Sequence, residues 1–239
     1  MTELILVVGI CSVGKTHHLI QELQNQNIYS NVLVYAPNDE QQYIEKAKAT
    51  QTSIQDIEKN FCKPKTIHPY RRSDVKIHFI HAPHKAKPEE HVKNMNKIIS
   101  KFKHGILVLD NKDYYSHYTN TSRILQSIQP KSENKCIVLV YQSFGSIPKE
   151  LILLANRITL YEVADYKSVA QHIPLIKKDL LFLANQILKN TTGKNKHRRH
   201  VHIHHWKFLE GNYTKQEYQN ACLDLLIENA GLNKYNSNH

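Results

Sequence analysis

The feature that most constrains this chain is a glycine-containing segment that follows a short apolar run. Residues 4–8 read Leu-Ile-Leu-Val-Val and residues 9–16 read Gly-Ile-Cys-Ser-Val-Gly-Lys-Thr, which fits the pattern G-x-x-x-x-G-K-[ST]. The apolar run is short and largely β-branched, so it predicts a buried strand of a parallel sheet. Glycines let backbone N–H groups turn toward a phosphate, and a helix that begins after the loop adds a favourable dipole. The pattern therefore predicts a strand, a phosphate-binding loop and a helix, in that order.

The residue types in this loop indicate a nucleoside triphosphate with its metal ion. Lys15 is placed to reach the β- and γ-phosphates, and the Thr16 hydroxyl is placed to ligate Mg²⁺. We therefore expect ATP and Mg²⁺ as the ligands. The predicted nucleotide-binding residues are Gly9, Ile10, Cys11, Ser12, Val13, Gly14, Lys15, Thr16 and His17.

Apolar runs alternate with helical patterns along most of the chain. Strands are predicted at residues 32–35, 75–80, 106–110, 136–141 and 158–163, and helices at 15–25, 89–102, 121–129, 148–156 and 175–188. Residues 39–60 are polar and mostly helical in pattern, and residues 61–74 predict a loop. This alternation predicts an α/β fold with a mostly parallel sheet and helices on both faces. With the loop at residues 9–16, the pattern resembles a P-loop NTPase of the RecA-like (ASCE) type.

The composition changes after Lys189, where residues 190–199 are polar and basic. We therefore expect an ATPase domain at residues 1–189 and a basic, His-rich extension at residues 190–239, packed on or appended to the same domain. Residues 200–208 are a candidate strand and residues 214–229 a predicted helix. On a strand, His200, His202 and His204 would share one face. Three imidazoles can bind Zn²⁺, but no Cys lies nearby, so a polar edge strand or a contact with DNA or a protein partner is favoured.

An acidic residue ends the aliphatic run 106–109. Asp110 would stand at the carboxyl edge of a buried parallel strand, where an acid that supports Mg²⁺ is needed. Hydrolysis also needs a group that orients or deprotonates water, and many such ATPases place Glu directly after this Asp. Asn111 occupies that position here. Asp113 is the nearest acid and our candidate; a more distant acid and slow hydrolysis are the alternatives.

A polar residue also follows the run 136–141. Gln142 would stand at the tip of the next strand, where an amide can sense the γ-phosphate and relay its state to loops that bind DNA. An ordinary strand-end amide is the alternative interpretation of the same residue.

The stretch CIVLVYQSFGSIPKELILLANRITLYEV, residues 136–163, has a distinctive order of features. A hydrophobic strand ends in Gln142, the pair Ile147-Pro148 precedes a helix, and Asn156 precedes a further strand. This order resembles the HerA/FtsK superfamily of DNA-pumping ATPases, especially its small viral genome-packaging members. The resemblance covers roughly residues 3–170, and residues 142–163 carry the assignment to this branch.

The resemblance implies roles for particular residues. Lys15 and Thr16 match the nucleotide and Mg²⁺ residues of the family, Asp110 its Walker B acid, and Gln142 its strand-four glutamine. The family also uses an arginine finger supplied by a neighbouring subunit. Arg123 is the only Arg between Asp110 and Gln142, and it is our first candidate for that finger; the second is the Arg at position 157.

The implied function is ATP-driven translocation of double-stranded DNA during packaging of a viral genome into a capsid. A finger supplied in trans requires a ring, a hexamer or pentamer. The expected partners are double-stranded DNA, further copies of the chain and capsid vertex proteins, in the cytoplasm of a host cell or in a virion. The alternatives are another P-loop DNA motor (a helicase, or a partition or secretion ATPase) and a non-hydrolysing nucleotide-binding assembly protein. A small-molecule kinase would need an arginine-rich lid, and residues 111–135 carry one Arg.

Composition agrees with an anionic partner. The chain has 32 Lys and Arg against 21 Asp and Glu, a formal net charge of +11.

No apolar run is long enough to span a bilayer, so we expect no transmembrane segment. Four scattered Cys without a C-x-x-C pair favour reduced thiols. Candidate contacts with a phosphate backbone are Lys63, Lys65, His68, Arg71 and Arg72, with Lys85 and Lys87 as a weaker pair; solvated basic loops are the alternative.

Overall fold

The computed structural model describes residues 2–9, 14–26, 28–37, 40–61, 75–82, 86–110, 121–129, 134–161, 173–189 and 199–231. The strands are β1 (Thr2–Val8), β2 (Asn31–Tyr35), β3 (Thr50–Thr52), β4 (Lys76–Ile80), β5 (Gly105–Asp110), β6 (Lys135–Tyr141), β7 (Arg157–Leu160), β8 (Val201–His204) and β9 (Phe208–Gly211). The helices are α1 (Lys15–Asn25), α2 (Glu40–Ala47), α3 (Ile57–Phe61), α4 (Pro88–Lys101), α5 (Thr121–Ile128), α6 (Lys149–Leu154), α8 (Leu175–Lys189) and α9 (Lys215–Asn229).

These strands form one nine-stranded sheet in the order β3-β4-β2-β5-β6-β1-β7-β8-β9. The seven strands from β3 to β7 in that order are all parallel to their neighbours. β8 then pairs antiparallel with β7, and β9 pairs antiparallel with β8. The predicted α/β fold with a mostly parallel sheet is therefore confirmed.

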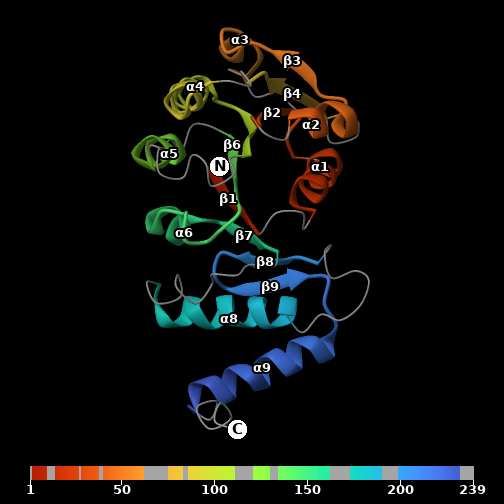
Figure 1. Cartoon of the computed structure of the whole chain (residues 1–239), viewed down its shortest axis with the longest axis vertical. Coiled ribbons are helices and arrows are strands. Elements are labelled where there is room, and N and C mark those ends of the chain that lie inside the picture. The colour runs from red at the N-terminus through yellow and green to blue at the C-terminus, as the bar shows by residue number, and fades with distance from the viewer. Residues whose placement is uncertain are drawn as a thin grey trace.

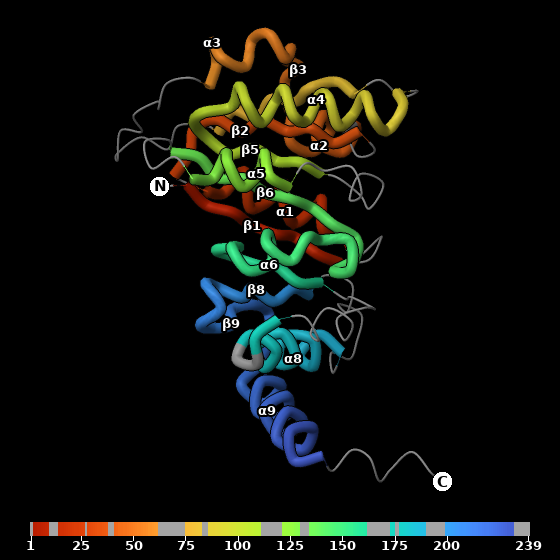
Figure 2. The backbone as a smooth tube through the Cα atoms, turned by 90° about the vertical axis from the view of Figure 1, so that its left-hand side faces the viewer, coloured from red at the N-terminus to blue at the C-terminus, as the bar shows by residue number. Residues whose placement is uncertain are grey.

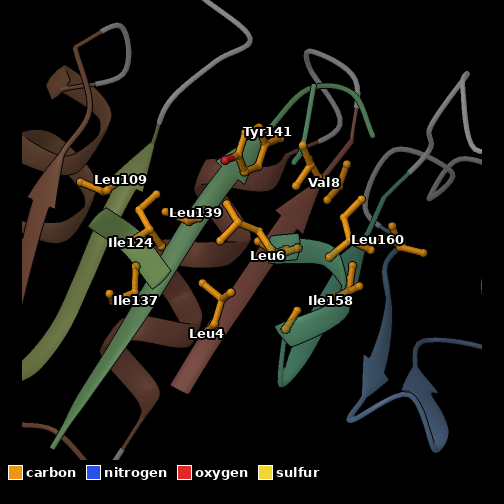
Figure 3. Close-up of a cluster of buried hydrophobic side chains, with 14 of the residues drawn as sticks. Leu4, Leu6, Val8, Leu109, Ile124, Ile137, Leu139, Tyr141, Ile158 and Leu160 are labelled. Atoms are coloured by element: carbon orange, nitrogen blue, oxygen red, sulfur yellow. The ribbon is translucent and has the colours of Figure 1, made fainter. Parts of the chain in front are cut away.

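Helices cover both faces of the sheet (Figure 1). α1 and α2 lie on one face, while α4, α5 and α6 lie on the other (Figures 1 and 2). Side chains of β1 alternate between the two cores, with Leu4, Leu6 and Val8 in one and Val7 in the other. Figure 3 shows how the first of these cores joins β1, β6 and β7 to Ile124 of α5. Burial on both faces explains why these strands read as continuous apolar runs.

Two parts of the fold differ from the sequence-based expectation. Residues 39–60 are mostly helical, as expected, in α2 and α3, but Thr50–Thr52 adds the edge strand β3 beside β4, which separates the two helices. Residues 200–208 are not one strand but the first half of the β8–β9 hairpin. His205 and Trp206 turn the chain with φ of 48° and 55°. Both differences come from tertiary pairing, which overrides local propensity.

The C-terminal residues continue the same sheet. α8 packs against β8 and β9, and α9 packs on α8 at one end of the molecule (Figure 1). α9 begins with a capping box, in which Thr214 Oγ1 accepts a hydrogen bond from Glu217 N–H and the Glu217 carboxylate accepts one from Thr214 N–H. No helix within the described ranges combines the length and apolar character needed to cross a membrane.

Candidate nucleotide-binding site

The strand order places three predicted site residues at the carboxyl ends of neighbouring central strands. β6 lies between β1 and β5, so the chain ends of these three strands are neighbours. Gly9 follows β1 and donates its N–H to the carbonyl oxygen of Tyr141, the last residue of β6, over 3.2 Å. Gln142 comes next and is half-buried, and Asp110 ends β5 beside Val140. Gln142 therefore emerges between the strand that enters the phosphate-binding loop and the strand that carries Asp110.

The described part of the loop has the geometry that its glycines predict. Gly14 has a φ of 81°, a left-handed conformation that side chains disfavour, and α1 begins at the next residue. The His18 N–H closes the first turn of α1 on the Gly14 carbonyl over 2.9 Å. The Lys15 ammonium donates to the Gly9 carbonyl, so the side chain lies across the mouth of the loop. The positions 10–13 of the predicted loop lie outside the described residues.

Asp110 is the acidic centre of the site and is only 2% exposed. Its Oδ2 accepts a hydrogen bond of 3.0 Å from the hydroxyl of Tyr43 on α2. The Thr16 hydroxyl lies 3.4 Å from the same oxygen, beyond the roughly 2.5–3.0 Å of ordinary O–H···O bonds. The Asp110 carboxylate thus faces the first turn of α1 and is hydrogen-bonded to Tyr43, a residue that was not predicted from the sequence.

This pair of oxygens fits a magnesium ion. Hydroxyl and carboxylate oxygens are hard ligands of the kind Mg²⁺ prefers, and Mg²⁺ usually takes one or two protein ligands with phosphate and water oxygens completing the set. A cation bound here would favour the charged form of a carboxylate as buried as that of Asp110. Over the part of the chain that the structure describes, no three His, Cys, Asp or Glu side chains gather as a metal site. Thr16 and Asp110 are thus the residues that could hold such an ion.

The structure describes both candidate arginine fingers, Arg123 and Arg157. Arg123 lies on α5, which packs on the face of the sheet opposite α1, and it lines a cavity of about 350 Å³ between α4 and α5. Arg157 forms an ion pair of 2.9 Å with Glu22 of α1 in its own chain. Asp113 and the neighbouring Asn111 lie outside the described residues.

A second group of polar side chains joins α1 to the C-terminal hairpin, and we call it the histidine cluster: His18, Glu22, Arg157, Thr159, Tyr161, His200 and His202. The Tyr161 hydroxyl and His18 Nδ1 are 2.7 Å apart, and the rings of His18 and His200 have centroids 3.8 Å apart. Thr159 Oγ1 and His202 Nδ1 are 2.9 Å apart. The hairpin therefore touches the helix that carries Lys15 and Thr16, a contact with no local sequence signal.

Burial favours the neutral form of two imidazoles in the histidine cluster, those of His18 and His202. It lowers the pKa of His18, with the Glu22 carboxylate acting in the opposite direction. It also lowers the pKa of His202 to about 2, and the charge of Arg157 contributes in the same direction. The Glu22 carboxylate lies 3.6 Å from His202 Nε2, but burial and Arg157 outweigh it. As expected for a strand, His200, His202 and His204 follow one another on one face, with ring centroids 4.7 and 5.8 Å apart.

The nine-stranded, mostly parallel sheet with its helices gives the chain the fold of P-loop NTPase structures. No family model matches it, and no curated protein matches it. Among solved structures, it is similar to the genome packaging NTPase B204 from Sulfolobus turreted icosahedral virus 2 in complex with sulfate. The two chains are 13% identical with a TM-score of 0.56, over 88% of this chain and 95% of that chain.

Two further B204 structures agree. The complex with AMP is 12% identical, with a TM-score of 0.54 over 87% of this chain and 96% of that chain. B204 described as the DNA-packaging ATPase of Sulfolobus Turreted Icosahedral Virus is 13% identical, with a TM-score of 0.54 over 89% and 97% of the two chains. At these identities, the likeness shows a shared fold along nearly the whole chain.

Proposed function

We propose that this chain is an ATPase that moves double-stranded DNA, and that it packages a viral genome into a capsid. The observation that carries the proposal is the approach of Thr16 to Asp110, with Gln142 following β6, the strand between the loop strand and the Asp110 strand. The similarity to a viral genome packaging NTPase and the net charge of +11 support the same function.

Each residue of the site has a task in this proposal. Lys15 would leave the Gly9 carbonyl to contact the β- and γ-phosphates of ATP. Thr16 and Asp110 would hold Mg²⁺, which neutralises phosphate charge when bound. Tyr43 would fix the Asp110 carboxylate, and Gln142 would sense the γ-phosphate from the end of β6.

Two further tasks, the activation of water and the supply of an arginine finger, are assigned to Asp113 and Arg123. Asp113 is our candidate for the group that orients the attacking water. Arg123 is our candidate for a finger that acts on the nucleotide of a neighbouring subunit, since α5 lies on the opposite face from its own loop. A finger in trans requires a closed assembly of identical subunits, a hexameric or pentameric ring. Capsid vertex proteins are the further partners that packaging would require.

The test combines the rate of ATP hydrolysis with the mass of the assembled protein. ATP hydrolysis is measured with and without duplex DNA, and the mass of the assembled species is measured with Mg²⁺, a slowly hydrolysed ATP analogue and DNA together. We expect stimulation by DNA and a closed multimer. Hydrolysis that ignores DNA, in a protein that stays monomeric with both ligands, would sink the proposal.

One observation favours a second function. Asn111 stands where many such ATPases have the Glu that activates water. A nucleotide-binding assembly protein that does not hydrolyse ATP would tolerate this amide. Tight Mg²⁺-dependent ATP binding with no turnover, with and without DNA, would select this function over the motor.

A further inference from the structure

A groove lies at the opposite edge of the sheet from the β8–β9 hairpin. It has a volume of about 1150 Å³ and is walled by β3, the turn after it, α3, β4 and α4. Figure 1 shows these elements together at one end of the molecule, with α9 at the other end. The nucleotide site lies further along the same sheet, at the ends of β1, β5 and β6.

The lining of this groove is rich in cations and hydrogen-bond donors. Lys59 comes from α3, Lys97 and Lys101 from one face of α4, and His78 and His81 from β4 and the residue that follows it. Hydroxyl and amide side chains of β3 and its turn complete much of the wall. Asp56 is the acidic member of this lining, and its carboxylate accepts a 2.6 Å hydrogen bond from Ser53.

A nearby carboxylate only weakly offsets these cations. Glu58 lies 3.4 Å from the Lys101 ammonium, but its side chain is 65% exposed. An exposed ion pair contributes about 0–1 kcal/mol, so Lys101 can exchange Glu58 for another anion at little cost.

The chemistry of the lining favours the backbone of a nucleic acid over its bases. Lys, Ser, Thr, Asn and Gln side chains are the usual partners of phosphate and sugar oxygens. The groove lining contains no Phe, Tyr or Trp among the residues that the structure describes. Proteins that hold single strands rely on such rings to stack the bases. A duplex, which presents its phosphates outward, therefore suits this groove better than a single strand.

We propose that the groove between β3, α3 and α4 binds the sugar-phosphate backbone of duplex DNA. This inference rests on the proposed function for the identity of the polyanion. The groove is also tied to the nucleotide site, because β3 directly follows α2, and α2 carries Tyr43. The Ala49 N–H donates to the Tyr43 carbonyl over 3.3 Å, and the Tyr43 hydroxyl contacts Asp110. DNA against β3 would thus press on the helix that holds the acid of the site.

The test replaces the groove lysines together, as Lys59→Gln, Lys97→Gln and Lys101→Gln in one full-length variant. Its control, Lys46→Gln with Lys207→Gln and Lys215→Gln, removes the same charge from exposed positions outside the groove. Binding to a fluorescent 30-base-pair duplex is measured by anisotropy at several salt concentrations. We expect the groove variant to bind at least about tenfold more weakly, with a salt slope smaller by about three, whereas the control stays within about threefold of the wild type.

A thermal unfolding curve and the DNA-independent ATPase rate show whether the groove variant is folded. If this variant folds and binds duplex like the control, the groove inference fails while the motor proposal stands. If the wild type itself does not bind duplex, the proposed function fails first. Equal weakening for a single strand of the same length would overturn the assignment to a duplex.

Discussion

At the scale of single residues, the account depends on how Asp110 is held. The Tyr43 side chain is fully buried, and its hydroxyl donates to the Asp110 carboxylate. Hydrogen bonds to charged groups contribute about 1.5–3 kcal/mol, and removal of only the hydroxyl keeps the ring in its place. The position of the carboxylate relative to Thr16 should therefore loosen without loss of the core.

We predict that Tyr43→Phe lowers the rate of ATP hydrolysis by about tenfold and raises the Mg²⁺ concentration needed for half-maximal activity. The matched control is Tyr213→Phe, which removes a hydroxyl that donates to the Leu209 carbonyl in the C-terminal hairpin. Steady-state rates across a Mg²⁺ titration check this prediction. An unchanged Mg²⁺ dependence in a well-folded Tyr43→Phe protein would show that Tyr43 does not position the acid.

At the scale of elements, the hairpin and α1 are joined by imidazoles that pack together, His18 with His200, and by the approach of His202 to Glu22. His202 faces His18 and Glu22 from α1, Arg157 and Thr159 from β7, His204 on its own strand, and His200 just before that strand. An unfolded histidine has a pKa near 6.5, whereas burial holds the folded pKa of His202 at about 2. Below about pH 6.5, His202 binds a proton in the unfolded chain but not in the native protein. Stability therefore falls as the pH falls.

We therefore predict that the melting temperature drops between pH 7 and pH 5, and that His202→Gln makes this drop smaller. His205→Asn is the control, because His205 is exposed in the same hairpin and Asn tolerates its left-handed conformation. Thermal unfolding across this pH range checks the slope. If the melting temperature of His202→Gln depends on pH as steeply as that of the wild type, His202 does not govern acid stability.

The elements also show what a sequence can and cannot predict. The strand, loop and helix around Lys15 depend on neighbours in the chain, so their pattern could be recognised directly. The edge strand β3 depends on pairing with β4, more than twenty residues later, and its three polar residues are too short a run to show a strand pattern of their own. The turn at His205 and Trp206 lacks the Gly or Asn that normally marks a hairpin.

The candidate site divides in the same way. Asp110 and Gln142 were predicted because strand ends of a parallel sheet meet at one edge. Tyr43 could not be predicted, since its contact with Asp110 joins residues 67 positions apart across two elements. The stacking of His18 on His200 likewise needs the full sheet order, which brings β8 beside β7.

At the scale of the whole molecule, the sheet arranges the proposed activities along one axis. The groove stands at the β3 edge, the nucleotide site near the middle, and the hairpin at the other edge, where it contacts α1. In the proposed function, DNA at one edge would act on Asp110 through α2, while the hairpin contacts α1 from the other edge. In the proposed function, Lys15 and its loop bind the ATP whose hydrolysis drives the movement of DNA.

The most direct test of that claim is the rate of Mg²⁺-dependent ATP hydrolysis with duplex DNA present, compared between the wild type and Lys15→Ala. The control is Lys46→Ala, an exposed lysine at the end of α2. Loss of a charge that stabilises the transferred phosphoryl group costs about 2.7 kcal/mol or more. We predict turnover by the wild type and the control, and a rate at least about 100-fold lower for Lys15→Ala. A folded Lys15→Ala protein that hydrolyses ATP as fast as the wild type would contradict the account.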